Sequence, residues 1–241
     1  MHAPLDGKLL ILLAHPDDEI FILPFLSKVQ VQTFFVYLTN NSRYFSADRS
    51  RELNESIHRF RAQGYDFQIE KFEKPCRDGF CFLDLSEEHF RQIDNFIRTN
   101  NVTRIASLAL EGGHQDHDVA SLFSRKLAIT NNIDFIEFSA YKKPKKNLFS
   151  LAVMKPQKKG VSFSFSRLEV IKNVFSLTLL YRSQWRTWLG LLPFIMYRYS
   201  CFSFYSEAAN LQIDGPYISL YESRMHASKI EVVNATRWLT I

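Results

Sequence analysis

Two short polar clusters in the sequence carry side chains that can bind a metal ion and activate water. The first, residues 15–19 (His-Pro-Asp-Asp-Glu), follows the apolar run of residues 8–14. His15 and Asp18 lie three residues apart, and across a tight turn that opens into a helix both side chains can approach one centre. An imidazole and a carboxylate are two of the three protein ligands that a catalytic zinc site needs, with water in the fourth position. Asp17, between them, is left to act as a base toward that water.

The third ligand is expected from the second cluster, residues 111–117 (Glu-Gly-Gly-His-Gln-Asp-His). This cluster follows another apolar run, residues 105–110. An apolar run of this length predicts a strand that is buried on both faces of a parallel sheet. Open α/β sheets bind their ligands at the carboxyl ends of such strands. Two strand ends that each carry a His/Asp cluster can therefore meet over one edge of a single sheet.

Each cluster alone has a simpler explanation. A His-Pro-Asp sequence can cap a helix, with Asp17 or Asp18 accepting backbone N–H groups. The pair Gly112-Gly113 can form an ordinary turn, although it also suits a loop that approaches a metal closely. Two complementary clusters, both at predicted strand ends, favour the metal site over these explanations.

The elements around the clusters alternate between strands and helices. We predict strands over residues 8–14, 32–39, 67–72, 103–110 and 133–138, helices over residues 19–29, 46–63, 86–99 and 118–130, and a loop over residues 76–84. Gly64 is placed to end the second helix. The repeated β-α-β alternation predicts an α/β fold, a parallel sheet with helices on both faces. We expect a single domain over residues 1–241, with a regular core at about 8–140 and a less regular C-terminal part, 141–241, packed on it.

The C-terminal part is basic and aromatic. Residues 142–146 and 155–160 predict basic, solvated turns, or else the rim of a site for an anionic substrate, and residues 166–181 predict a helix. Residues 185–205 are strongly aromatic, but Arg186, Pro193 and Arg198 interrupt them, so they do not form a transmembrane span. We expect this segment to pack in the core, and contact with a bilayer surface or a lipid tail is the alternative.

The composition is that of a globular protein, with 46% hydrophobic and 23% charged residues, and the net charge of +5 favours an anionic partner. The three cysteines have no metal-ligand spacing, and their odd number argues against a full disulfide set, so we expect reduced thiols. Residues 1–7 do not resemble a signal peptide, which predicts a cytoplasmic protein. A nucleic-acid partner is not expected, because no binding module is recognisable and the lysine clusters lie in turns. The sequence does not indicate an oligomeric state.

Together the two clusters resemble the zinc-dependent de-N-acetylases of the LmbE-like, or PIG-L, family, through Ala14-His-Pro-Asp-Asp-Glu19 and Gly113-His-Gln-Asp-His117. The resemblance implies a Rossmann-like (LmbE-like) fold. It also implies hydrolysis of the N-acetyl group of N-acetylglucosamine units carried on lipids, inositols, thiol precursors or other glycoconjugates. The implied cofactor is zinc, bound by His15, Asp18 and His117, although iron, cobalt or manganese also suits two histidines and a carboxylate.

The resemblance implies roles for the neighbouring residues as well. Water on the zinc has a pKa lowered toward roughly 7, which supplies hydroxide near neutrality. Asp17 takes the proton as water attacks the acetamide and later passes it to the leaving amine. His114 stabilises the oxyanion, either as a donor or as a cation, and Asp116 orients His114 or His117.

Two further stretches extend the resemblance to about residues 8–200. Residues 49–53 (Arg-Ser-Arg-Glu-Leu) are similar to the family's Arg-x-x-Glu-Leu helix, which implies that Arg49 contacts substrate hydroxyls or phosphate; an ordinary surface arginine is the equal alternative. Residues 181–184 (Tyr-Arg-Ser-Gln) are similar to its His-Arg-Ser-Gln segment, which implies substrate contact by Arg182. The chain departs from the family at Gln115, where proline is usual, and at Tyr181, where histidine is usual.

These observations predict a hydrolase for an N-acetylated amino sugar. The basic turns and the aromatic segment favour a phosphate-bearing or lipid-linked substrate and peripheral contact with a membrane. Two alternatives stay open. One is an amidase that acts on another N-acyl sugar or on a thiol-precursor conjugate, and the other is a non-catalytic sugar- or lipid-binding protein of the same fold.

Overall fold

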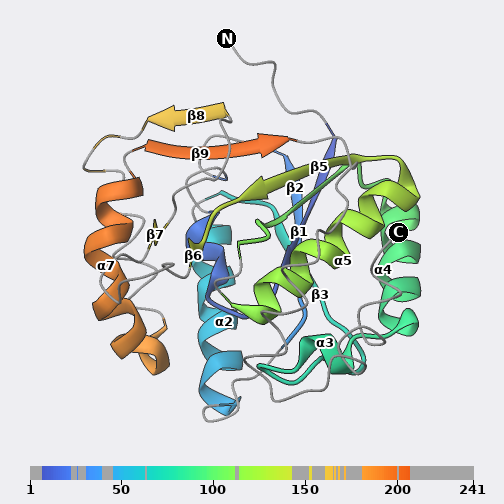
Figure 1. Ribbon diagram of the computed structural model, residues 1–241, viewed down its shortest axis with the longest axis horizontal. Helices are drawn as coiled ribbons and strands as arrows, with labels where there is room; N and C mark the ends of the chain where they lie inside the picture. The colour runs from blue at the N-terminus through green and yellow to red at the C-terminus, as the bar shows by residue number, and fades with distance from the viewer. Residues whose placement is uncertain are drawn as a thin grey trace.

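The computed structural model describes residues 7–22, 26, 31–39, 46–62, 64–111, 114–142, 152–153, 161–164, 166, 168, 171, 181–199 and 201–206. Its centre is a seven-stranded sheet in the order β3-β2-β1-β4-β5-β9-β8 (Figure 1). Five strands run parallel: β1 (Lys8–Leu13), β2 (Gln32–Tyr37), β3 (Phe67–Glu70), β4 (Arg104–Leu108) and β5 (Asp134–Phe138). Two antiparallel strands extend the sheet beyond β5, namely β8 (Val161–Ser164) and β9 (Cys201–Ser206). A small second sheet consists of β6 (Tyr141–Lys142) and β7 (Ala152–Val153).

Helices lie close to the ranges that the sequence predicts. The α-helices are α2 (Ser46–Ala62), α3 (Cys81–Asp84), α4 (Glu87–Asn100), α5 (Gln115–Asn131) and α7 (Trp185–Tyr199), and the 3₁₀ helices are η1 (Asp18–Phe21) and η2 (Arg182–Gln184). Gly64 ends α2 as predicted. Its φ of 91° turns the chain so that the N–H of Tyr65 reaches the carbonyl of Phe60 at 3.1 Å.

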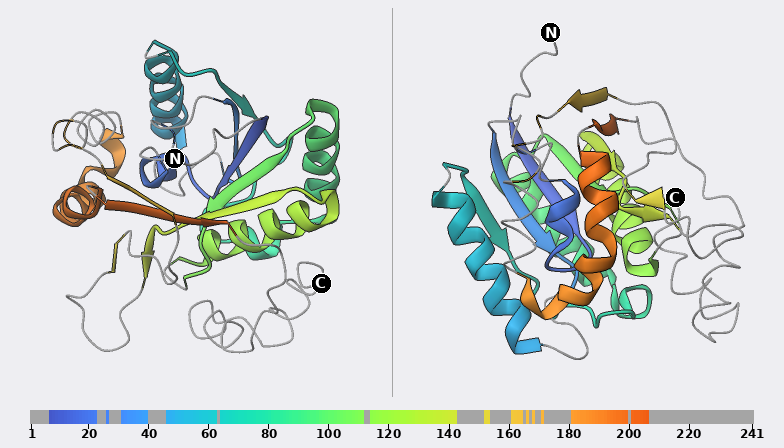
Figure 2. Two further views of the ribbon diagram at one scale, coloured as in Figure 1. Left: turned by 90° about the horizontal axis from the view of Figure 1, so that it is seen from above. Right: turned by 90° about the vertical axis from the view of Figure 1, so that its left-hand side faces the viewer.

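Alternate side chains of β1 enter two different hydrophobic cores. Leu9, Ile11 and Leu13 pack in a core that includes the apolar face of α2. Leu10 and Leu12 pack in a second core, which includes apolar residues of α4 and α5. Figure 2 shows α2 on one face of the sheet and α4 and α5 on the other. The predicted α/β fold, with a parallel sheet covered on both faces, is therefore confirmed.

Two helices begin where the sequence did not predict them. The predicted loop over residues 76–84 contains the short helix α3. The helix predicted from residue 118 begins at Gln115, because His114 caps it: the imidazole of His114 accepts the N–H of Asp116. This capping task usually falls to serine, threonine, aspartate or asparagine, so the earlier start was missed. Asp116 and His117 consequently lie in the first turn of a helix.

Other predictions meet the structure only in part. The helix predicted from residue 19 begins as the 3₁₀ helix η1, and most of its remaining residues lie outside the described residues. Most of the helix predicted over residues 166–181 also lies outside them. The same is true of residues 143–146, 155–160 and 207–241. In α7, Trp188 is buried, whereas Trp185 and Leu189 are 57% and 66% exposed. The expected core packing therefore holds for Trp188 but is wrong for Trp185 and Leu189. No helix within the described ranges has the length and hydrophobicity to span a bilayer.

Candidate metal centre

The first polar cluster forms a tight turn at the end of β1. The N–H of Asp18 donates to the carbonyl of His15 at 3.2 Å, and the carboxylate of Asp18 accepts the N–H of His15 at 2.8 Å. Asp17, at the centre of the turn, has a left-handed backbone with φ of 113° and ψ of −17°. Thr39, just beyond β2, supports the turn by donating its N–H and its hydroxyl to the carbonyl of Ala14, each at 3.0 Å. This turn brings Nδ1 of His15 to 3.5 Å from the Asp18 carboxylate.

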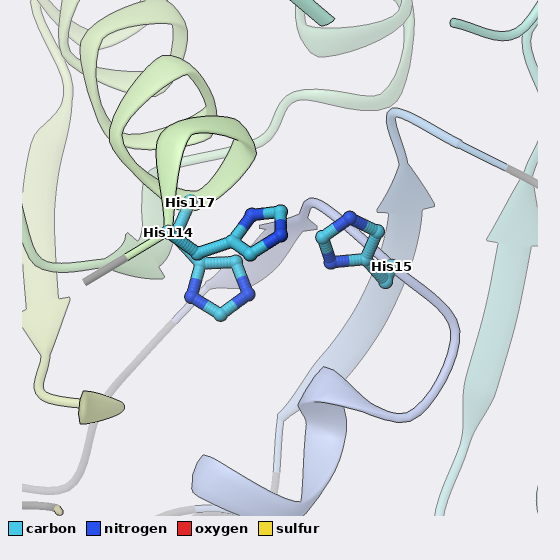
Figure 3. Close-up of side chains that lie close together, drawn as sticks. All are labelled: His15, His114 and His117. Carbon is cyan, nitrogen blue, oxygen red and sulfur yellow. The ribbon is translucent and has the colours of Figure 1, made fainter. Parts of the chain in front are cut away.

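The sheet brings the second cluster to the first. β1 and β4 are parallel neighbours that pair Leu12 with Ser107, and the hydroxyl of Ser107 also donates to the Leu12 carbonyl at 2.8 Å. Their carboxyl ends therefore lie at one edge, where Nε2 of His117 comes within 3.1 Å of Asp18. Figure 3 shows His15, His114 and His117 gathered together, with ring centroids between 4.9 and 5.4 Å apart.

Asp18 links two of these histidines at distances that suit a metal ion. Its carboxylate lies 3.5 Å from Nδ1 of His15 and 3.1 Å from Nε2 of His117. A tetrahedral site with metal–ligand bonds of about 2.0–2.2 Å places neighbouring donor atoms roughly 3.4 Å apart. The two contacts use different oxygens of Asp18, Oδ2 toward His15 and Oδ1 toward His117, so the side chains must adjust for the three residues to hold one ion.

Two other sets of side chains share this centre. The ligand atoms of His15, His114 and His117 lie within 4.8 Å of one another, and the same holds for those of His15, Asp78, His114 and Asp116. These two sets therefore lie within the span of a metal site as they stand. They differ from the set around Asp18 in that both require His114 as a ligand.

Asp116 lies against His15 rather than against His114 or His117. Its fully buried carboxylate accepts hydrogen bonds from Nε2 of His15 at 3.1 Å, from the N–H of Gly79 at 2.6 Å and from the N–H of Cys81 at 3.2 Å. Because an ionised carboxylate only accepts, Nε2 of His15 carries a proton, and Nδ1 is the nitrogen that faces Asp18. A carboxylate behind a histidine ligand is the usual arrangement in protein metal sites.

The carboxylates around His15 make its position favourable for a cation. Burial lowers the pKa of His15, but contacts with Asp116, Asp18 and Asp78 outweigh burial and raise that pKa well above the ordinary histidine value. The same negative field stabilises any positive charge at this point, whether a proton or a divalent metal. The electrostatics of the site therefore fit a bound cation.

His114 is arranged as a neutral hydrogen-bond donor. Its Nδ1 accepts the N–H of Asp116 at 3.2 Å, so the proton of the neutral ring is on Nε2. Burial, together with the charges of His15 and His117, lowers the pKa of His114 to about 3. The sequence predicts that His114 acts either as a neutral donor or as a cation, and this geometry fits the neutral donor. The lone pair of Nδ1 is occupied and Nε2 carries a proton, which makes His114 a poor metal ligand.

The loop over residues 77–80 approaches the centre without a sequence signal that predicts it. Oδ1 of Asp78 lies 3.2 Å from Nε2 of His15. The side-chain amide of Gln115 donates to the carbonyl of Gly79, which fastens the loop to the start of α5. Glutamine thus stands at the first position of a helix, where proline is also favoured, and adds a bond that proline cannot make. An Asp-Gly pair in a predicted loop indicates a turn and nothing more.

No contact among the described residues joins Arg49 or Arg182, the two arginines expected to bind substrate, to the centre. Arg49 lies in α2, but its side chain is outside the described part of the chain. Arg182 begins η2 and is exposed. Substrate contact by Arg49 or Arg182 stays a prediction.

Comparison with known proteins finds the same fold among solved structures. No protein-family model and no curated protein matches the sequence. Among the solved structures of similar fold are the following three. The conserved protein TT1542 from Thermus thermophilus has a TM-score of 0.59 at 18% identity, over 85% of this chain and 96% of its own. The N,N'-diacetylchitobiose deacetylase from Pyrococcus horikoshii has a TM-score of 0.58 at 16% identity, over 88% of each chain. A deacetylase of teicoplanin biosynthesis has a TM-score of 0.56 at 17% identity, over 79% of this chain and 90% of its own.

At this level of identity the likeness establishes a common fold. The parallel five-stranded sheet with helices on both faces is the fold of two enzymes named as deacetylases. A shared fold does not determine the chemistry, which depends on the residues of the site.

Proposed function

We propose that this protein is a metal-dependent N-deacetylase of the LmbE-like, or PIG-L, type. The reaction is hydrolysis of the N-acetyl group of an N-acetylglucosamine-type amino sugar in a glycoconjugate or glycolipid pathway. The observation that carries the proposal is the position of Asp18, 3.5 Å from Nδ1 of His15 and 3.1 Å from Nε2 of His117, with Asp17 in the same turn. The fold shared with two deacetylases supports it.

The donor set favours zinc. His15, Asp18 and His117 would hold the ion through two nitrogens and one carboxylate, which leaves a fourth position of a tetrahedral site open. Iron, cobalt or manganese would also be accepted by these ligands. A bound zinc ion supplies Lewis acidity, which polarises an amide carbonyl and makes water more acidic.

The proton transfers fall to the protein. Asp17 accepts the proton of the attacking water and returns it to the amide nitrogen, which must be protonated before it can leave as an amine. His114 donates Nε2–H to the oxygen on which negative charge develops, and a neutral donor of this kind is effective because it is already in place. Asp116 keeps His15 in the tautomer that offers Nδ1 to a metal.

We infer a substrate with a phosphate or a lipid attached to the sugar. The net charge of +5 and the basic residues of the C-terminal part support an anionic substrate. The exposed side chains of Trp185 and Leu189 on α7 add apolar surface. Arg49 and Arg182 are the arginines that we propose for contact with the substrate.

The experiment that tests the proposal is acetate release by the metal-loaded protein across a panel of N-acetylglucosamine compounds. The panel contains the free sugar and its nucleotide-linked, inositol-linked and polyprenyl-diphosphate-linked forms. We expect acetate from one linked class, with an equal amount of free amine. The matching N-methylsulfonyl analogues, which lack the carbonyl, serve as controls and should release nothing.

No acetate from any compound, with metal confirmed in the protein, would contradict the proposed substrate class and favour another amide, such as a thiol-precursor conjugate. No acetate together with no bound metal would contradict the reaction itself and favour a sugar- or lipid-binding protein.

A further inference from the structure

The carboxylate of Glu19 is buried, with 1% exposure, and has four hydrogen-bond donors around it. One oxygen accepts the N–H of Asp17 at 2.9 Å and the hydroxyl of Tyr37 at 3.3 Å. The other accepts the hydroxyls of Ser56, at 3.1 Å, and of Tyr181. A buried carboxylate is costly unless it is hydrogen-bonded. These donors, which we call the Glu19 cluster, therefore hold Glu19 in one position.

The carboxylate of Glu19 restrains the backbone of Asp17 directly, through the N–H of Asp17. The φ of 113° at Asp17 is unusual for a residue with a side chain, and such a conformation persists only where the surrounding structure holds it. The bond from the N–H of Asp17 to Glu19 is one restraint, and the bond from the N–H of Ile20 to the carbonyl of Asp17, at 3.3 Å, is another. The first of these depends on where the Glu19 carboxylate is held.

Tyr181 reaches Glu19 from 162 residues further along the chain. The tyrosine is 1% exposed. Burial, together with the charge of Glu19, raises the pKa of Tyr181 well above the ordinary value, so the hydroxyl keeps the proton that it donates. Of the donors in the Glu19 cluster, this is the one supplied by the C-terminal part of the chain.

The segment that carries Tyr181 is anchored at two points that follow the tyrosine in the chain. The N–H and the hydroxyl of Ser183 donate to the buried carboxylate of Glu52 in α2, at 2.8 and 2.6 Å. Further along, the ring of Trp188 in α7 packs against that of Phe21 in η1, with centroids 6.3 Å apart. The hydroxyl of Tyr181 is therefore presented to Glu19 by a segment whose own position is fixed.

We infer that Tyr181 and Glu19 are positioning residues for Asp17: the tyrosine hydroxyl fixes the Glu19 carboxylate, and Glu19 fixes the left-handed turn that carries Asp17. This inference rests on the proposed role of Asp17 as the base. It assigns a function to the tyrosine found where the related segment has histidine. It also gives the C-terminal part of the chain a role in catalysis that requires no contact with substrate.

The test is Tyr181→Phe, which removes the hydroxyl and keeps the ring, measured against Tyr65→Phe. Tyr65 is a half-buried tyrosine that packs with Phe60 and Phe67, outside the Glu19 cluster. We expect faster amide hydrogen exchange in the peptide that contains Asp17, and a kcat that is lower by about 10- to 100-fold with KM nearly unchanged. Zinc affinity should stay close to that of the wild type. Glu19→Gln should give the same pattern, which keeps the test open if Tyr181→Phe folds poorly.

Unchanged exchange at Asp17 and unchanged kcat in both variants would overturn the inference. So would loss of zinc binding or of overall stability in step with kcat, because that result indicates a general structural role. Hydrogen exchange separates this inference from the proposed function. Faster exchange at Asp17, in a metal-loaded protein whose wild type releases no acetate from any compound, would support the positioning of Asp17 and contradict the proposed substrate class.

Discussion

Replacing Asp17 by asparagine should lower acetate release by roughly 10²- to 10⁴-fold, the usual contribution of a general acid–base residue. Asparagine has the same shape but neither takes up nor returns a proton. It also tolerates a left-handed backbone at least as well as aspartate, so the turn should survive the substitution. The measurement is kcat on the best substrate of the panel, together with the metal content per chain, which we expect to be unchanged.

The matched control is Asp66→Asn, which makes the same chemical change at an exposed position outside the site. It should leave kcat within a factor of about two, as surface substitutions generally have small effects. Full activity in Asp17→Asn, with metal bound, would contradict the assignment of Asp17 as the base. Loss of the metal in Asp17→Asn would instead indicate that Asp17 is a ligand.

Substitution of Asp18 should remove the metal, whereas the same substitution at Asp78 should not. Asp18→Asn keeps an oxygen for the N–H of His15 but loses the charge that joins His15 and His117. We expect zinc affinity to fall by more than about 100-fold, beyond the roughly 10- to 100-fold cost of losing an outer hydrogen-bond partner. Equilibrium competition with a chromogenic chelator measures the affinity of both variants.

The comparison with Asp78 distinguishes the overlapping ligand sets. Asp78 lies 3.2 Å from Nε2 of His15 and belongs to the set that includes His114 and Asp116. Tight zinc binding by Asp18→Asn with weak binding by Asp78→Asn would contradict the ligand set proposed here. It would move the metal to the other side of the His15 ring.

The fold and the first half of the site could be predicted because their signals are local. The apolar run before His15 indicates a buried strand, and His15, Asp17 and Asp18 share one turn, so their spacing alone places them together. The second cluster could be placed from topology, since parallel strands end at one edge of a sheet. The choice of His117 within it rests on the resemblance to the LmbE-like family.

The remaining contacts join positions far apart in the chain, and no local pattern marks them. The carboxylate of Asp116 is held by Gly79, 37 residues away, and faces His15 instead of the histidines next to it in sequence. The sequence around Glu19 is typical of an acidic residue in the first turn of a helix. In the structure Glu19 is buried and accepts a hydrogen bond from Tyr181. Histidine is an uncommon helix cap, which concealed the true start of α5.

The most direct test of a metal-dependent deacetylase is to add zinc in steps to metal-free protein and to follow acetate release at each step. We predict no acetate without metal, and a rate that rises in proportion to added zinc until about one equivalent per chain is bound. His117→Ala, measured in parallel, should stay inactive over the same range. Acetate release by the metal-free protein, or a rate that does not follow zinc occupancy, would contradict the account.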